Sequence, residues 1–286
     1  MVFTRILWPL NTEHGLLQAS MDRFDLDTAY ILAQASRAAY PDSVQTAQTQ
    51  LGLDQIIAFE EGVVAGFAGR FGENIVVAFR GTPFLNKGGE PLQLAEAIFT
   101  DLAAGLTSYA GIPGSIHRGF ANTLPIVSGM LPSVLKDLQK VQDTAPKRSN
   151  RHQRIWFTGH SMGGALAVLA AKAVYVQHHI LPRVYTYGAP RVGDRTFGEH
   201  YEPTHYRVER RKDLVPYAFP PYTLIPGTYK HTGIRCCIDG HQIEIGGTFD
   251  PLGMIDAQLG REHNIDTYLE DLKKRPRITY LDTLSP

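Results

Sequence analysis

Along most of the chain, short runs of apolar residues alternate with stretches in which apolar residues recur at the spacing of a helix. Runs of this length that end at glycine-containing turns are typical of strands, whereas apolar residues three or four positions apart indicate helices. The pattern predicts strands at 54–59, 63–68, 74–79, 155–158, 183–187 and 205–209. It predicts helices from a cap at Asp25 or Asp27 to Tyr40, from about 119 to 141 with a first half made irregular by Pro125 and Pro132, and from about 262 to 273.

The order of these elements sets the fold class. Strands that alternate with helices predict a three-layer α/β sandwich with a mostly parallel central sheet. A chain of 286 residues with 43% hydrophobic residues can bury a large core, and we expect a single domain over 1–286. The stretch 218–260 is predicted to be an irregular insertion in that domain.

Composition excludes several classes of function. Lys+Arg 28 balance Asp+Glu 28 without basic or acidic blocks, so the sequence gives no support for nucleic-acid binding through a charged face. No apolar run approaches the ~20 residues of a membrane span. The run 6–10 is too short for a signal core, and the chain as given is predicted to be cytoplasmic unless a leader was removed. Adjacent Cys236 and Cys237 make no disulfide framework, and no cluster has metal-ligand spacing, so we expect neither metal nor cofactor.

The pentapeptide at 159–163, Gly-His-Ser-Met-Gly, lies between an apolar strand and a helix of small residues. A serine on such a sharp turn is the nucleophile elbow of serine hydrolases. We expect the turn to hold Ser161 in a strained conformation, with Gly159 and Gly163 present because larger side chains would collide with the neighbouring strand and helix. The alternative is a glycine-rich turn without chemistry.

Acyl transfer by a serine needs a histidine base and a carboxylate that orients it. In α/β-hydrolases the acid follows the serine along the chain and precedes the histidine. Asp213 comes just after the strand that ends near Arg211, which is the place expected for the acid. Asp194 follows the strand 183–187, but it precedes a short helical stretch and is predicted to be an N-cap.

Three histidines follow the predicted acid. His241 lies at the tip of a predicted hairpin, and His231 comes early on a long loop. His263 directly precedes an amphipathic helix, where this architecture delivers its base, and we predict that it is the base. His160, inside the elbow, is expected to point away from the nucleophile, and His117 is expected to be buried and hydrogen-bonded.

Five segments occur in one order along the chain: 75–82 (IVVAFRGT), 116–120 (IHRGF), the elbow, 187–194 (YGAPRVGD) and 213–216 (DLVP). Together they resemble the class 3 lipases, the α/β-hydrolase group of the filamentous-fungal triacylglycerol lipases and their bacterial and plant relatives. The resemblance covers about residues 55–272. It implies an α/β-hydrolase fold with the acid at Asp213 and the base at His263, five residues before a tyrosine.

Two hydrogen-bond donors are needed for the oxyanion of the tetrahedral intermediate. The elbow supplies the backbone N–H of Met162 at the start of its helix. Thr82 comes directly after a strand and Gly81, and the resemblance gives the role of second donor to this hydroxyl residue. The alternative for Thr82 is an ordinary turn residue, and Arg80 is predicted to make a structural salt bridge.

The segment 83–95 leaves the strand that precedes Thr82 and places Phe84 and Leu85 before a Gly-Gly hinge. The resemblance implies a mobile lid here, over 83–97, and the alternative is an irregular surface loop. The proline-rich run 218–226 is a candidate lining of an acyl pocket.

These residues predict a carboxylic-ester hydrolase that cleaves acylglycerol esters through an acyl-enzyme intermediate, with lipid at a lipid–water interface as its partner. Two alternatives keep the same triad: a phospholipase A1 or galactolipase, and a short-chain carboxylesterase. A third is a catalytically silent lipid-binding relative, which is disfavoured because every triad position holds a suitable residue.

Overall fold

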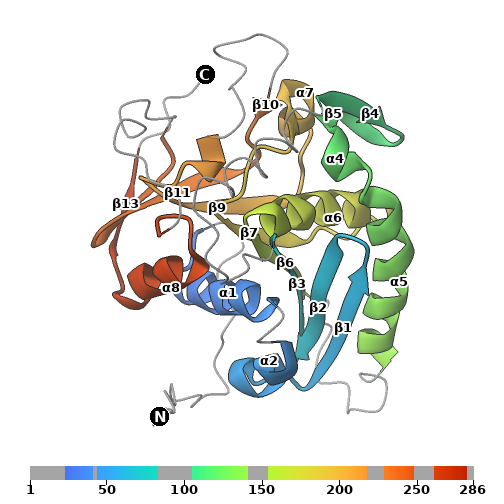
Figure 1. Ribbon diagram of the computed structural model, residues 1–286, viewed down its shortest axis with the longest axis horizontal. Coiled ribbons are helices and arrows are strands. Elements are labelled where there is room, and N and C mark those ends of the chain that lie inside the picture. Colours follow the sequence, from blue (N-terminus) through green and yellow to red (C-terminus); the bar gives the residue numbers. More distant parts are fainter. Residues whose placement is uncertain are drawn as a thin grey trace, which may run out of the picture.

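The computed structural model describes residues 23–40, 44–82, 105–140, 154–217, 229–247 and 261–281. Its centre is a nine-stranded sheet in the order β1-β2-β3-β6-β7-β9-β11-β12-β13 (Figure 1). The strands are β1 (Gln55–Glu61), β2 (Val64–Phe71), β3 (Asn74–Phe79), β6 (Arg154–His160), β7 (Arg183–Tyr187), β9 (Thr204–Arg210), β11 (Ile234–Asp239), β12 (Gln242–Ile245) and β13 (Arg277–Tyr280).

The sheet is mostly parallel, as predicted. The five neighbours β3, β6, β7, β9 and β11 run parallel, and so do β12 and β13. Antiparallel pairing is confined to the β1-β2-β3 meander and the β11-β12 hairpin. Because central parallel strands are covered on both faces, their residues are buried on both sides, as residues 155–160 of β6 all are.

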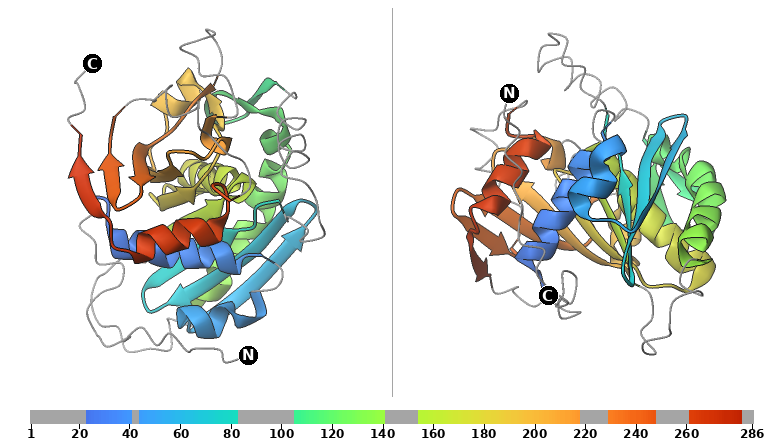
Figure 2. Two further views of the ribbon diagram at one scale, coloured as in Figure 1. Left: turned by 60° about the vertical axis from the view of Figure 1, so that its left-hand side comes forward. Right: turned by 90° about the horizontal axis from the view of Figure 1, so that it is seen from below.

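Helices cover both faces of this sheet and complete the predicted three-layer sandwich (Figure 2). On one face lie α5 (Leu124–Lys140) and α6 (Met162–His178). On the other lie α1 (Leu26–Ala38), α2 (Val44–Leu51) and α8 (Ile265–Lys273). The cap of the first helix is Asp25, whose side chain accepts a hydrogen bond from the Thr28 backbone at 2.7 Å. No helix in the described ranges is long and apolar enough to cross a membrane.

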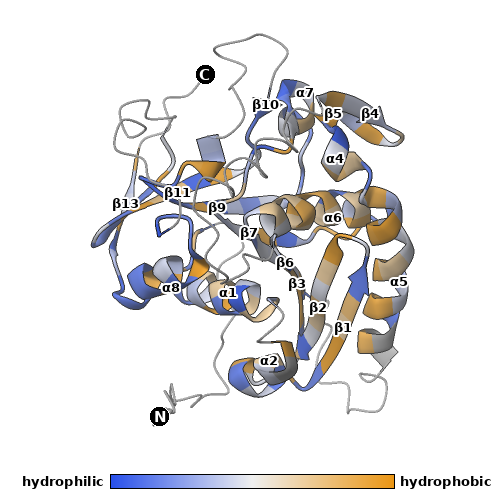
Figure 3. Ribbon diagram, in the orientation of Figure 1, coloured by the Kyte–Doolittle hydropathy of each residue, from blue (hydrophilic) through white to orange (hydrophobic). Residues whose placement is uncertain are grey.

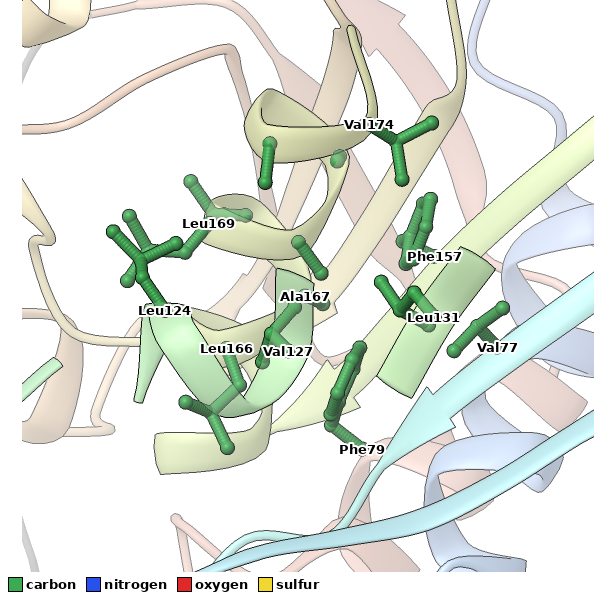
Figure 4. Packing of buried hydrophobic residues seen from close by; sticks show 14 of the residues in the cluster. Val77, Phe79, Leu124, Val127, Leu131, Phe157, Leu166, Ala167, Leu169 and Val174 are labelled. Atoms are coloured by element: carbon green, nitrogen blue, oxygen red, sulfur yellow. The ribbon is translucent and has the colours of Figure 1, made fainter. Parts of the chain in front are cut away.

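The helix α6 is the one that follows the elbow, and it is packed on every side. All residues from Gly163 to Val174 are buried, between the sheet and α5. Figure 4 shows Leu166 and Leu169 of this helix against side chains of α5, beside Phe79 and Phe157 of the sheet. Apolar colours accordingly dominate α6 in Figure 3. This packing fixes the end of the helix that carries the elbow.

The helix predicted over 119–141 is interrupted once. A short helix, α4 (Arg118–Ala121), ends before α5 begins at Leu124. Pro125 falls in the first turn of α5. Backbone N–H groups in a first turn have no partner within the helix, so the missing N–H of proline costs no helical hydrogen bond. Pro132 lies inside α5, which continues through it, so the predicted irregularity is limited to the break before Leu124.

The prediction of an irregular insertion at 218–260 is wrong for its described part. Residues 229–247 include β10 (Tyr229–Lys230) and the hairpin β11-β12, which extends the central sheet. Residues 235–238 of β11 are all buried, and this run is too short and too mixed in polarity to stand out in the sequence. Both cysteines are free. The predicted lid at 83–97 and the run 218–226 lie outside the described residues.

A second, four-stranded sheet in the order β10-β8-β5-β4 was not predicted. It consists of β4 (Leu106–Tyr109), β5 (Ile112–His117), β8 (Gly193–Asp194) and β10, next to the helix α7 (Arg195–Glu199) (Figure 1). Two of its strands are only two residues long, so they carry no periodic pattern.

Candidate active site

The turn between β6 and α6 has the strained geometry of an elbow. Ser161 has φ 58° and ψ −130°, a conformation that non-glycine residues rarely adopt. Its N–H donates to the Tyr187 carbonyl at 2.9 Å, which ties the turn to the neighbouring strand β7. The serine side chain is thereby presented at the carboxyl end of the sheet, at the positive end of the α6 dipole.

Glycine is required on both sides of the serine for steric reasons. A Cβ at Gly159 would lie 2.2 Å from the Gly163 carbonyl oxygen. A Cβ at Gly163 would lie 2.3 Å from the carbonyl oxygen of Phe79 in β3. Strand and helix backbones therefore approach each other more closely than any side chain allows, as the sequence predicted.

We expect Gly163→Ala to lower the free energy of unfolding by about 1–3 kcal/mol, because the methyl group forces two backbones apart. The matched control is Gly129→Ala in α5, where a Cβ meets nothing within 4 Å and alanine is expected to stabilise the helix by up to ~1 kcal/mol. Urea unfolding followed by circular dichroism measures both changes. Equal stability of the two variants would contradict the steric argument.

The structure brings Ser161, His263 and Asp213 together from three separate elements. Ser161 Oγ lies 2.8 Å from His263 Nε2, and His263 Nδ1 lies 2.8 Å from Asp213 Oδ2. Asp213 follows β9, His263 precedes α8, and all three residues are at most 1% exposed. In this arrangement one ring nitrogen faces a hydroxyl and the other faces a carboxylate.

Both oxygens of the Asp213 carboxylate accept further hydrogen bonds. Oδ1 accepts from the Val215 backbone at 2.9 Å, and Oδ2 accepts from the Tyr268 hydroxyl at 2.6 Å. Burial, followed by the neighbouring Asp213, raises the pKa of Tyr268 well above its ordinary value, so the tyrosine stays protonated and donates. Gly188, with φ +56°, leaves the room for this cluster, because its Cβ would lie 2.5 Å from Oδ2.

The role of Tyr268 was not foreseen in the sequence. Its position on the apolar side of α8 is explained equally well by core packing, and the side chain is fully buried. The one available signal was its spacing, because a tyrosine five residues after the predicted base lies on the turn of helix nearest to it.

The rejected candidates occupy other places. Asp194 caps α7, accepting from the Phe197 backbone at 2.8 Å and from the Ser115 backbone at 2.9 Å, so its predicted cap role is confirmed. His231 Nε2 lies 2.8 Å from the Pro216 carbonyl oxygen, and His241 is exposed in the β11-β12 turn.

Two further predictions concern residues around the site. The predicted burial of His117 is confirmed, with its ring 4.8 Å from that of Phe120, whereas the hydrogen bond predicted for its ring stays a prediction. Arg80 pairs with Glu60 at 3.1 Å, which confirms the predicted salt bridge. His160 is also buried, but it stacks on the ring of His263 at 4.6 Å between ring centres, a contact that the sequence did not indicate.

Thr82 lies beside the start of α6. Its Oγ1 is 3.8 Å from Met162 Sδ, and Met162 is the first residue of the helix. The two predicted oxyanion donors thus come from adjacent strand ends next to Ser161.

Within the described ranges, no group of three or more His, Cys, Asp or Glu side chains is arranged to hold a metal ion.

A mostly parallel sheet with a serine elbow, followed along the chain by an aspartate and then a histidine that meet it, defines the α/β-hydrolase fold. The sequence model of the family described as Lipase (class 3) matches residues 76–223, about half of the chain. The chain therefore belongs to the class 3 lipase family, as its ordered motifs indicated.

Individual proteins are similar to parts of this chain. The toxin TseL of Vibrio cholerae is 34% identical over 126 residues, 43% of this chain and 18% of the toxin. The triacylglycerol lipase OBL1 of Nicotiana tabacum is 40% identical over 100 residues, 30% of this chain and 17% of that protein. The match therefore spans less than a fifth of either relative. The crystal structure of the lipase from Rhizopus microsporus var. chinensis is 25% identical with a TM-score of 0.58, covering 74% of each chain.

Proposed function

We propose that this protein hydrolyses carboxylic esters of acylglycerols, with Ser161 as nucleophile, His263 as base and Asp213 as the residue that orients the base. The observation that carries the proposal is the unbroken run of hydrogen bonds from the serine hydroxyl through the imidazole to the carboxylate. Membership of the class 3 lipases and the name of the tobacco relative support the substrate class.

In the proposed reaction His263 Nε2 takes the Ser161 proton while the oxygen attacks the ester carbonyl. The Met162 N–H and the Thr82 hydroxyl donate to the oxyanion, and each such donor is worth about 10²–10³ in turnover. His263 then gives its proton to the departing alcohol. A water attacks the acyl-enzyme in the same way, with the fatty acid as second product.

Asp213 fixes the proton on Nδ1 of His263, which leaves the Nε2 lone pair free to accept the serine proton. The carboxylate also stabilises the imidazolium that forms. Its own negative charge is held by the Val215 N–H and the Tyr268 hydroxyl. Buried donors of this kind need no reorganisation during the reaction.

The test is a panel of nitrophenyl esters of graded chain length, triacylglycerol emulsions, and vesicles of phospholipid or galactolipid. We expect fastest acyl release from the acylglycerol emulsions, with a rise in rate once substrate exceeds its solubility and forms an interface. Titration of released fatty acid measures this, and Ser161→Ala serves as the blank.

Each alternative predicts a different result in the same panel. Faster release from phospholipid or galactolipid vesicles would make the protein a phospholipase A1 or a galactolipase. A preference for soluble short-chain esters without a rise at the solubility limit would make it a carboxylesterase. Binding to emulsions with no release from any ester would make it a silent lipid-binding relative.

A further inference from the structure

Behind the proposed base lies a second buried cluster, formed by Tyr40 and His160. His160 is 1% exposed, and its Nε2 lies 2.6 Å from the backbone carbonyl oxygen of His263. Its Nδ1 lies 2.8 Å from the Tyr40 hydroxyl. The rings of His160 and His263 stack with their centres 4.6 Å apart and their planes at 34°.

The proton positions in this cluster follow from its partners. A carbonyl oxygen only accepts, so Nε2 of His160 must carry the hydrogen that it donates to His263. Burial, and then the neighbouring His263, lower the pKa of His160 well below its ordinary value, so the ring is neutral and Nδ1 keeps its lone pair. The Tyr40 hydroxyl, whose pKa burial raises, must therefore donate to Nδ1.

The resulting chain of bonds runs from Tyr40 to His160 and ends on the main chain of His263. The side chain of His263 is already held by Ser161 and Asp213, one at each ring nitrogen. The hydrogen bond from His160 to the His263 carbonyl fixes what remains free, namely the position in which the loop before α8 holds the Cα of His263. His263 becomes positively charged during the reaction. Because His160 is neutral, no like charge then lies against the face of the His263 ring.

The same tyrosine contacts the loop that carries Thr82. A Cβ at Gly81 would lie 2.4 Å from the Tyr40 hydroxyl oxygen and 2.7 Å from the His160 carbonyl oxygen. The hydroxyl thus packs directly on the backbone of Gly81, the residue before the proposed oxyanion donor. One side chain from the end of α1 touches the oxyanion loop and, through His160, the loop of the base.

We propose that Tyr40 and His160 are positioning residues, which hold the main chain of the base and the oxyanion loop in register around Ser161. This role rests on the proposed function, because it concerns the same reaction. Neither residue touches the reacting atoms. Their effect is on geometry, and a displacement of the base by 1 Å can cost about 10² in rate.

The experiment compares variants on a soluble short-chain nitrophenyl ester. We expect Tyr40→Phe to lower kcat about 10-fold and His160→Leu about 100-fold, both with KM within about two-fold of wild type. His160→Gln restores an N–H that can reach the His263 carbonyl, and it is expected to recover most of the loss. The double variant of Tyr40→Phe and His160→Leu is expected to lose much less than the product of the two single losses, because the chain is already broken in His160→Leu and only the contact of the Tyr40 hydroxyl with Gly81 remains to be lost.

Tyr185→Phe is the matched control. Its hydroxyl accepts a hydrogen bond from the Asp25 backbone at 3.3 Å, at the other end of α1, so its loss weakens the same helix without touching the cluster. We expect its kcat to stay within about two-fold of wild type. Thermal unfolding accompanies each variant, and if His160→Leu fails to fold, the comparison of Tyr40→Phe with Tyr185→Phe decides.

Unchanged kcat in a folded Tyr40→Phe variant would overturn the positioning role, and so would an equal loss in Tyr185→Phe or a loss confined to KM. Failure of His160→Gln to exceed His160→Leu would overturn the part assigned to the backbone bond. Wild-type protein that turns over no ester would contradict the proposed function instead, so the two failures are distinguishable.

Discussion

Replacement of Ser161 by alanine is expected to lower kcat by about 10⁶ on any ester that the wild type cleaves. The hydroxyl is the only group at the elbow that can form the acyl-enzyme, and the residual rate reflects binding and oxyanion donors alone. Its recorded hydrogen-bond partner is His263 Nε2, so we expect the fold to survive the substitution. Steady-state kinetics on a nitrophenyl ester, together with circular dichroism, measures both effects.

Ser36→Ala is the control for the loss of a buried hydroxyl. Ser36 is fully buried in α1 and bonds to Leu32 and Thr158, so its removal tests stability without chemistry. We expect it to cost about 1 kcal/mol of stability and to leave kcat within a few-fold of wild type. Retention of a tenth of the activity in Ser161→Ala would remove Ser161 from its proposed role.

The elbow was predictable because its signal is local. Gly159 and Gly163 are dictated by backbone contacts within one strand-turn-helix unit, and that unit is contiguous in the sequence. The acid and the base lie further along the chain. The acid was predictable because residues after parallel strands meet at one edge of the sheet, and the base because this architecture delivers it just before the last helix. Asp194 was set aside by a local cap pattern, and the structure bears out that cap.

The remaining parts depend on contacts that join distant segments. His160 meets Tyr40 across 120 positions, and Tyr268 meets Asp213 across 55, so the separation of the two partners along the chain indicates neither pair. Core packing alone accounts for the positions of Tyr268 and His160 in the sequence, and both residues are indeed buried. The hairpin around His241 was predicted, but the pairing of its first strand, β11, with β9 was not, because that pairing joins separate segments of the chain.

The second large effect is expected for Asp213→Asn, which should lower kcat by about 10⁴. Each oxygen of this carboxylate accepts hydrogen bonds: Oδ1 from the Val215 N–H and, at 3.1 Å, from His263 Nδ1, and Oδ2 from the Tyr268 hydroxyl and, at 2.8 Å, from the same Nδ1. An amide has one oxygen, so its NH₂ group must face one of these sets of donors. If the NH₂ group faces Val215, it meets the backbone N–H of Val215, so that two donors oppose each other.

Facing His263, the amide donates to Nδ1 of the imidazole and moves the ring proton to Nε2. That nitrogen then presents a hydrogen to Ser161 Oγ and cannot accept the serine proton. The expected loss therefore falls on kcat, with the fold retained, and kinetics on a soluble ester beside urea unfolding measures the two separately. Asp194→Asn is the matched control, because Asp194 also accepts at both oxygens, from Phe197 and Ser115, yet asparagine is itself a good N-cap. We expect it to cost about 1 kcal/mol of stability and to leave kcat within a few-fold of wild type.

Equal losses of kcat in the two variants, or a loss below ten-fold in Asp213→Asn, would show that Asp213 does not set the tautomer of the base.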